Sequence, residues 1–182
     1  TSYLARTNYL GSIMHPGNPR YSVIIPTLNE EKFLPPLLDS LADQSVKDFE
    51  VIVVDGKSRD KTIAVANSYK KKLPILHVIV SQKANLPLQR NLGAHNATCS
   101  WLVFVDADSI LMPYFMERIE RFIQAQKVQL FTTWARPDSE IPGDALVTLL
   151  GNMMLEGSIL FHRPLAPGPM TILVGTVIFV AS

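Results

Sequence analysis

Two aspartates, Asp106 and Asp108, stand directly after an apolar run of five residues, 101–105. An apolar run that ends at acidic residues is typical of a buried strand that reaches a polar site. Side chains alternate along an extended chain, so both carboxylates are expected to point the same way, with the small Ala107 between them. Close carboxylates repel each other, and a divalent cation relieves that repulsion. Oxygen ligands favour Mg²⁺ or Mn²⁺, with water and substrate phosphates completing the coordination.

The pair also has a purely structural interpretation. A helix is expected to begin near Pro113, and either aspartate could cap the N-terminus of that helix. The metal-binding interpretation is favoured by two other acidic segments, 26–31 and 55–60, each of which begins where an apolar run stops.

Apolar runs alternate with amphipathic segments along most of the chain. The runs predict strands at 21–25, 49–54, 75–80, 101–105 and 128–134. The intervening segments predict helices at 31–43, from Ser58 or Asp60 to about Lys70, at 87–97 and at 113–127. The buried faces of the first and last of these helices are expected to hold Phe33, Leu34, Leu37, Leu38 and Leu41, and Phe115, Ile119, Phe122 and Ile123. This order predicts an α/β fold, with a mostly parallel central sheet and helices on both faces.

Strand crossovers in parallel sheets are almost always right-handed, so the loops after the strands gather along one edge, where ligands bind. The three acidic segments are therefore expected to share that edge. No glycine-rich loop of the dinucleotide or P-loop type follows a predicted strand. A metal on the aspartate pair, helped by Arg90 or Lys83, would neutralise a diphosphate instead. The pattern predicts a nucleotide-diphosphate ligand.

Length and composition narrow the class of protein. The 182 residues fit one domain, with residues 1–20 as an N-terminal arm and 21–182 as the folded domain. A formal net charge of +1 argues against nucleic acid as a partner. The single Cys99 excludes an internal disulfide framework and suits a reducing compartment, so a cytoplasmic location is expected.

The late part of the chain is unusually apolar. No stretch has the roughly 18 to 20 uninterrupted apolar residues of a spanning helix, and the N-terminus lacks the pattern of a signal peptide. Residues 145–161 are apolar around most of a helical circumference. This segment is interpreted either as a buried helix or as a peripheral helix on the cytoplasmic face of a membrane.

Four motifs together resemble the family 2 glycosyltransferases, which have the GT-A fold. They are VIIPTLNEE at 23–31, FEVIVVDGKSRDKT at 49–62, LQRNLGAHNA at 88–97 and WLVFVDADS at 101–109. They occur in the family's order and approximate spacing. The resemblance is clear over about 21–127 and looser over the last 50 residues.

The resemblance implies a role for each matching residue. The base and ribose pocket would be lined by Pro26, Thr27 and Glu30, and the nucleobase would be bound by Asp55. Arg90 would lie by the diphosphate. The family's DxD motif would be Asp106, Ala107 and Asp108, with Asp106 facing the ribose or metal and Asp108 as the principal metal ligand. Two positions depart from the family pattern. Leu28 stands where relatives often carry Tyr, and Gly56 stands where many have a second Asp.

The implied activity is inverting transfer of a sugar from a UDP- or GDP-sugar to a hydroxyl of a lipid-phosphate or glycan acceptor, with Mg²⁺ or Mn²⁺. In relatives the general base is an Asp that follows a strand resembling 168–180, so it is expected beyond Ser182. Weaker candidates for the base are Asp138, Glu140, Asp144, Glu156 and His162.

Three alternatives to this activity remain open. A nucleotidyltransferase would normally carry a glycine-rich basic loop after the first strand, whereas this chain has PTLNEE. A non-catalytic nucleotide-sugar-binding module would need no base. A phospho-acceptor signalling domain would also have an acidic strand end, but it would leave Arg90 and PTLNEE unexplained.

Overall fold

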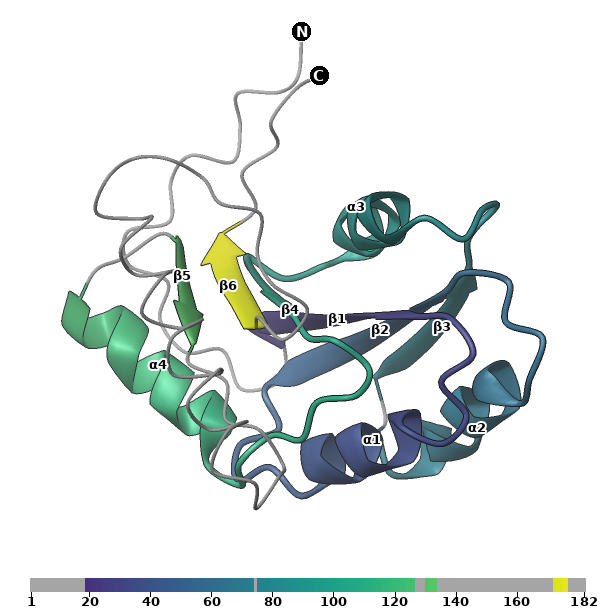
Figure 1. Cartoon of the computed structure of the whole chain (residues 1–182). Helices are drawn as coiled ribbons and strands as arrows, with labels where there is room; N and C mark the ends of the chain where they lie inside the picture. Colours follow the sequence, from purple (N-terminus) through teal and green to yellow (C-terminus); the bar gives the residue numbers. More distant parts are fainter. Residues whose placement is uncertain (1–18, 74, 127–129, 134–171, 177–182) are drawn as a thin grey trace, which may run out of the picture.

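A six-stranded sheet forms the centre of the protein in the computed structural model, which describes residues 19–73, 75–126, 130–133 and 172–176 (Figure 1). Its strands are β1 (Tyr21–Thr27), β2 (Phe49–Asp55), β3 (Leu76–Val80), β4 (Trp101–Phe104), β5 (Leu130–Thr133) and β6 (Ile172–Thr176). They lie in the order β3-β2-β1-β4-β6-β5. Strands β1 to β4 are parallel to one another, and β6 is antiparallel to both β4 and β5. The expected α/β fold with a mostly parallel sheet is confirmed.

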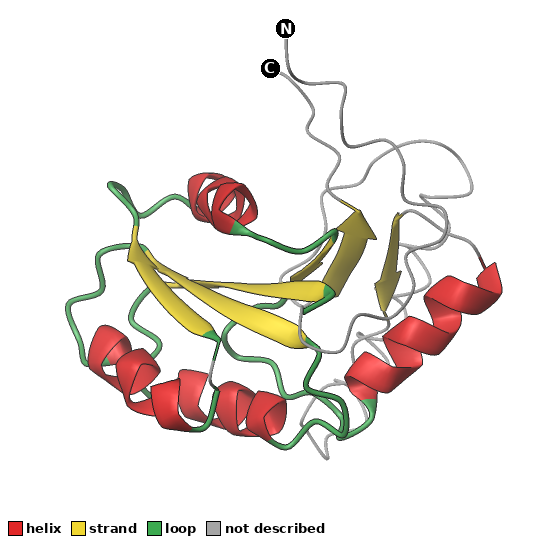
Figure 2. Ribbon diagram, turned by 180° about the vertical axis from the view of Figure 1, so that it is seen from behind, coloured by secondary structure: helices red, strands yellow, loops and turns green. Residues whose placement is uncertain are grey.

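Helices cover both faces of this sheet (Figures 1 and 2). They are α1 (Leu34–Ala42), α2 (Thr62–Ser68) with the short 3-10 helix η1 (Tyr69–Lys71), α3 (Leu86–Asn96) and α4 (Phe115–Gln126). Figure 2 shows α3 alone on one face and α1, α2 and α4 on the other. The parallel strands are therefore buried on both sides, which explains why their sequences are nearly continuous apolar runs.

The described core has two parts, one on each side of the sheet. Alternate residues of β1 divide between them, with Val23 and Ile25 facing the larger cluster and Ile24 facing the smaller. The larger cluster includes the buried face of α1, formed by Leu34, Leu37, Leu38 and Leu41. The smaller lies beneath α3 and is built on Ile24, Ile52, Val54 and Leu102.

Strand β1 is two residues longer than predicted, because Pro26 does not end it. The N–H of Gly56 donates to the carbonyl of Thr27 on the β2 side, so the backbone polar groups of Pro26 face β4 instead. The pairing of β1 with β4 stops at Ile24. Because Pro26 has no N–H to donate toward β4, the pairing with β4 ends there, while the pairing with β2 continues to Thr27.

Two predicted helix faces were partly wrong. Helix α1 begins only at Leu34, and Phe33, expected on its buried face, is 58% exposed. In α4 the buried residues are Met116 and Ile119, whereas Phe122 is 43% exposed. Phe33 precedes the helix, and Phe122 lies about 100° around the helix axis from Ile123, which packs against the core.

Several expectations lie outside the described residues. They concern the arm at 1–18, the apolar segment 145–161, and the candidate bases Asp138, Glu140, Asp144, Glu156 and His162. In the part of the chain that the structure describes, no helix is both long and apolar enough to cross a membrane.

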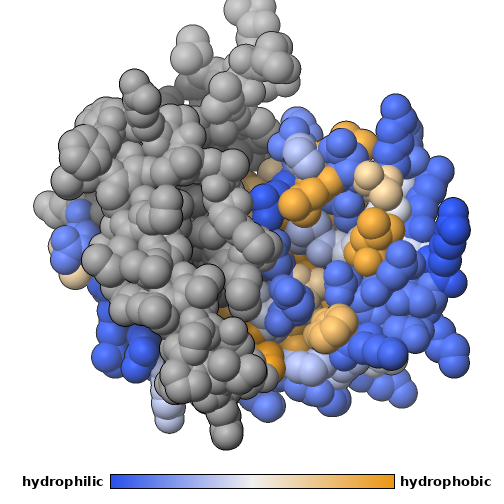
Figure 3. Space-filling model, viewed as in Figure 1, coloured by the Kyte–Doolittle hydropathy of each residue, from blue (hydrophilic) through white to orange (hydrophobic). Residues whose placement is uncertain are grey.

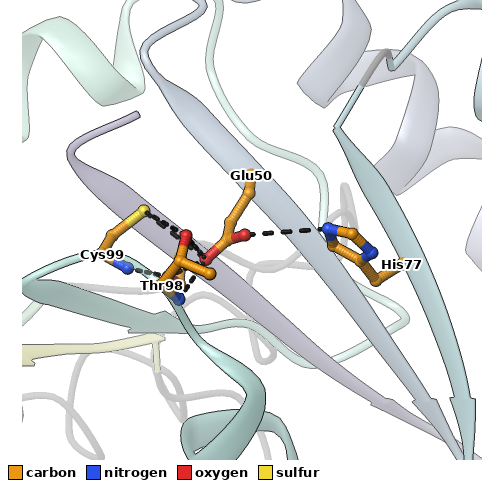
Figure 4. Close-up of polar contacts among 5 residues, drawn as sticks. Glu50, His77, Thr98 and Cys99 are labelled. Atoms are coloured by element: carbon orange, nitrogen blue, oxygen red, sulfur yellow. Dashed lines mark hydrogen bonds and ion pairs between the residues drawn. The ribbon is translucent and has the colours of Figure 1, made fainter. Parts of the chain in front are cut away.

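A buried carboxylate, that of Glu50, joins three strands near the amino-terminal ends of β1 and β2 (Figure 4). Its Oε1 atom accepts hydrogen bonds from the Ser22 hydroxyl at 2.6 Å and from the N–H and hydroxyl of Thr98 at 2.7 and 3.0 Å. Cys99 Sγ lies 3.5 Å from the same oxygen, and His77 Nε2 lies 3.9 Å from Oε2. Burial raises the pKa of Glu50, but these hydrogen bonds outweigh it and hold the pKa below its ordinary value. Glu50 therefore anchors the α3–β4 connection to the sheet.

Helix α3 packs against the sheet at Gly93, which is buried. A Cβ atom added there would lie 2.4 Å from Cγ2 of Ile24, far inside van der Waals contact. Alanine normally favours a helix over glycine by about 1 kcal/mol. At this position the clash with Ile24 outweighs that preference, so alanine is expected to destabilise the protein.

We expect Gly93→Ala to lower the free energy of unfolding by about 1–3 kcal/mol, the usual cost of overpacking. Urea denaturation measures the change, with the exposed Asn91→Ala on the same helix as the matched control, expected to stay within about 0.5 kcal/mol of the unaltered protein. A Gly93→Ala variant as stable as the control would contradict the close contact between α3 and β1.

Candidate functional site

The carboxyl ends of β1 and β2 meet at one edge of the sheet. Thr27 is paired directly with Asp55, and both side chains are buried, at 2% and 0% exposure. The loops that follow contain the first two acidic segments of the sequence, and the third follows β4, which is the other neighbour of β1. The predicted convergence of the three segments at one edge is thus observed.

Asp55 organises the loop after β2. Its Oδ2 accepts a hydrogen bond from the N–H of Ser58 at 2.8 Å, and its Oδ1 accepts from the Ser58 hydroxyl at 2.5 Å. The hydroxyl of Thr27 donates to the same Oδ1 at 3.3 Å. The carboxylate is therefore held in one orientation by its own loop and by β1.

Reciprocal hydrogen bonds join the β1–α1 loop to the β2–α2 loop. The N–H of Asn29 donates to the Ser58 hydroxyl, and Asn29 Oδ1 accepts from the N–H of Arg59, both at 2.8 Å. The N–H of Glu31 donates to Asp60 at 3.1 Å, and Glu31 accepts from the N–H of Lys61 at 2.9 Å. Two loops far apart in the sequence thus behave as one unit.

Helix α2 begins at Thr62, with Lys61 and not Ser58 or Asp60 at its N-cap position, but Asp60 still binds its first residue. Its Oδ1 accepts hydrogen bonds from the N–H and the hydroxyl of Thr62, at 3.0 and 2.5 Å. The Thr62 hydroxyl in turn accepts from the N–H of Glu30 at 2.8 Å. The Asp60 carboxylate therefore connects the joined loops to the first residue of α2.

Arg90 in α3 forms an ion pair with Asp106, with 2.9 Å between Nη2 and Oδ1. The guanidinium reaches the DxD segment, and 30% of the Arg90 side chain stays exposed. Its buried Nε has no hydrogen-bond partner among the described residues. Burial raises the pKa of Asp106 above its ordinary value, although Arg90 acts in the opposite direction.

The DxD segment lies in a turn beyond the end of β4 at Phe104, rather than on the extended strand that the sequence predicted. The N–H of Ser109 donates to the carbonyl of Asp106 at 3.1 Å. Ala107 is nonetheless buried, whereas Asp108 is exposed. At the start of α4 the N–H of Met116 donates to Oε1 of Gln44. The described side-chain contact with the backbone of this first turn thus comes from Gln44 and not from Asp106 or Asp108.

Acidic groups near the DxD segment influence one another. Burial raises the pKa of Glu30, and the charges of Asp108 and Asp60 raise it further. Asp108 likewise raises the pKa of Asp106. Hard oxygen donors in such surroundings fit a divalent cation. Within the described ranges no three His, Cys, Asp or Glu side chains group closely enough to hold a metal ion alone, so Asp106 and Asp108 would be two ligands beside those of a substrate.

The predicted site residues thus fall into two connected groups. The first, at the ends of β1 and β2, contains Pro26, Thr27, Glu30 and Asp55. The second contains Arg90, Asp106, Ala107 and Asp108. The sequence-based interpretation missed Asn29, Ser58 and Gln89, which hold these groups in place. Gln89 could have been found from the sequence as a polar residue on the side of the predicted helix 87–97 that packs against the sheet.

Residues 22–171 match the model of the family described as Glycosyl transferase family 2. The match spans most of the chain, so the chain belongs to this family. The family resemblance inferred from the four motifs is confirmed.

Two curated relatives show the extent of the similarity. A PGL/p-HBAD biosynthesis glycosyltransferase of Mycobacterium tuberculosis is 42% identical over 96 residues, covering 51% of this chain and 37% of the relative. The poly(ribitol-phosphate) beta-N-acetylglucosaminyltransferase TarS of Staphylococcus aureus is 34% identical over 107 residues, covering 57% of this chain and 19% of the relative. The chain therefore spans well under half the length of either relative.

Solved structures support the same fold. The structure of S. aureus TarS 1–349 with UDP-GlcNAc has a TM-score of 0.58 and 33% identity, covering 61% of this chain and 33% of that chain. A mannosyltransferase from Pyrobaculum calidifontis, solved with GDP-Man and Mn²⁺, has a TM-score of 0.58 at 23% identity, covering 72% and 39%. The second likeness concerns the fold alone. Together with the sheet topology, these matches confirm the expected GT-A fold.

Asn29 joins the two loops while adopting a left-handed backbone conformation, with φ of 58°. We expect Asn29→Gly, which keeps that conformation accessible, to cost about 1 kcal/mol through loss of the hydrogen bond from Arg59. Asn29→Ala should cost about 1–2 kcal/mol more, because a Cβ disfavours the left-handed region. Urea denaturation of both variants separates the contribution of the hydrogen bond from that of the left-handed backbone conformation. If both unfold like the unaltered protein, the joined loops contribute nothing to stability.

Proposed function

We propose that this chain carries the donor-binding part of an inverting glycosyltransferase. The enzyme would transfer a sugar from a UDP- or GDP-sugar to a hydroxyl of a lipid-phosphate or glycan acceptor, using Mg²⁺ or Mn²⁺. One observation carries the proposal: the ends of β1, β2 and β4 place Thr27, Asp55 and the Arg90–Asp106 pair at one edge of a family 2 glycosyltransferase fold.

Each group of residues has its own part in donor binding. Pro26, Thr27, Glu30 and Asp55 would form the base and ribose pocket, with Asp55 held in position by Ser58. Arg90, Asp106, Ala107 and Asp108 would form the diphosphate side. The Arg90 guanidinium has donors beyond the one used by Asp106, so it has the capacity to bind a phosphate oxygen as well.

The reaction needs charge stabilisation on the leaving group. An acceptor hydroxyl oxygen attacks the anomeric carbon as the bond from that carbon to the diphosphate breaks, so negative charge develops on the diphosphate oxygens. Arg90 would stabilise that charge from a fixed position. A divalent cation held by Asp106 and Asp108 would supply Lewis-acid stabilisation of the same oxygens. We assign the general base to none of the described residues.

The choice of donor and acceptor rests on relatives. TarS was solved with UDP-GlcNAc and is named for a poly(ribitol-phosphate) substrate. The mycobacterial relative is named for PGL/p-HBAD biosynthesis. The UDP-GlcNAc in the TarS structure supports a nucleotide-sugar donor and favours UDP for this chain. Peripheral contact of residues 145–161 with the cytoplasmic face of a membrane is part of the same proposal.

Calorimetric titration of UDP and GDP, each with and without Mn²⁺, tests the proposal. We expect one of the two to bind and its affinity to rise sharply with metal. Binding of neither would overturn the proposal. A subsequent transfer assay with the full-length protein distinguishes an enzyme from a non-catalytic binding module, since the module would bind the donor without transferring sugar.

Asp108 is exposed and is proposed as the principal metal ligand. We expect Asp108→Asn to remove the gain in UDP affinity that Mn²⁺ produces, while metal-free binding stays unchanged, because the amide keeps the shape and loses the charge. Titration calorimetry measures both affinities. Glu117→Gln in α4 serves as the control for loss of one carboxylate elsewhere. If Mn²⁺ still raised the UDP affinity of Asp108→Asn as much as that of the unaltered protein, Asp108 would not be a metal ligand.

Arg90 is proposed to bind the diphosphate. We expect Arg90→Ala to weaken UDP binding by about 1.5–3 kcal/mol, the usual range for a charge-assisted hydrogen bond, and to leave uridine binding nearly unchanged. Competition titrations with UDP and uridine measure the difference. Equal losses for both ligands would place Arg90 away from the phosphates.

A further inference from the structure

Gln89 in α3 is a buried polar residue, at 3% exposure, whose side chain reaches across the ends of two strands. Its Nε2 donates to the carbonyl of Thr27 at 2.9 Å and to the carbonyl of Val54 at 2.8 Å. These carbonyls belong to the last residue of β1 and the next-to-last residue of β2. The amide therefore links the two strand ends beside Asp55.

The orientation of this amide follows from its partners. Both contacts are carbonyl oxygens, which only accept hydrogen bonds, so the nitrogen of the amide must face them. The carbonyl of Thr27 also accepts from the N–H of Gly56 at 2.8 Å. With two donors on this carbonyl, both of its lone pairs are used. Rotation of the Gln89 amide would break two buried hydrogen bonds at once.

Gly56 lies against the same amide. A Cβ atom at position 56 would lie 3.0 Å from Oε1 of Gln89 and 3.2 Å from its Cδ and Nε2. The end of a glutamine side chain usually yields to such a contact, but this one is held by two carbonyls. The side chain at 89 thus fills the space that a side chain at 56 would need. A residue larger than glycine at position 56 would therefore crowd the Gln89 amide.

We propose that Gln89 is a positioning residue of the donor pocket and that Gly56 and Gln89 form a coupled pair that sets its selectivity for the nucleobase. The proposal rests on the nucleotide site described above. Gln89 acts through Thr27 and Asp55, the terminal residues of β1 and β2, whose side chains face each other at 3.3 Å. The phosphate-side residues Asp106 and Asp108 make no described contact with Gln89, so the effect falls on the base and not on the metal.

The first experiment replaces Gln89 by Leu, which has similar volume and no donor. We expect uridine and UDP to lose affinity by the same factor, at least fivefold, and the ratio of UDP to GDP affinity to change, while the enhancement of UDP binding by Mn²⁺ stays unchanged. Exposed Gln82→Leu, in the preceding loop, is the matched control and should bind like the unaltered protein. A general weakening of the fold would not change the UDP to GDP ratio at temperatures well below unfolding.

The second experiment tests the coupling with uridine affinities of Gly56→Ala, Gln89→Ala and the double variant. We expect Gly56→Ala to weaken binding at least threefold alone and less than 1.5-fold in the Gln89→Ala background, because the smaller side chain frees the space. Urea denaturation of the same set checks that each variant is folded and measures the coupling in stability.

The outcomes separate this inference from the proposed function. If the unaltered chain binds neither UDP nor GDP, the proposed function fails, and the role of Gln89 fails with it. If the unaltered chain binds UDP but Gln89→Leu keeps its affinity and its UDP to GDP ratio, only the role of Gln89 is overturned. Equal effects of Gly56→Ala in both backgrounds would overturn the coupling.

Discussion

The parallel pairing of β1 with β2 is the constraint on which the rest of the site depends. It places Thr27 opposite Asp55 at the end of both strands, and a slip of one strand by one residue would leave the two side chains on opposite faces of the sheet. The apolar runs are buried on both faces and resist such a slip, since alternate residues belong to two separate core clusters. The position of the polar groups is thus a consequence of core packing.

Contacts across the strand ends convert this pairing into a rigid edge. Asn29 and Glu31 exchange hydrogen bonds with the loop after β2. From the opposite face, α3 approaches β1 closely at Gly93 and links the strand ends through Gln89. The same helix carries Arg90 to Asp106. One helix therefore supports both the base side and the phosphate side of the candidate site.

Electrostatics divides the edge into unlike parts. Asp55 has its oxygens occupied by Ser58 and Thr27, which suits a fixed recognition group. Asp106 is compensated by Arg90 alone among the described contacts, and Asp108 lies exposed beside it. The negative charges of Asp108 and Asp60 repel that of Glu30 and, together with burial, raise the pKa of Glu30. Excess negative charge therefore gathers where a cation and a diphosphate are proposed to bind.

The sequence by itself determined the fold class, the order of the elements and the acidic edge, because apolar periodicity and strand-end polarity are local signals. The family was inferred from the resemblance of four motifs. The sequence-based interpretation misjudged where β1 ends, the exposure of Phe33 and Phe122, and the extended form of the DxD segment. Only the tertiary structure decided that Arg90 meets Asp106 and that Gln89 holds two strand ends. Such contacts join residues from 16 to 62 positions apart, and their partners are set by how closely α3 packs on the sheet, which no local pattern encodes.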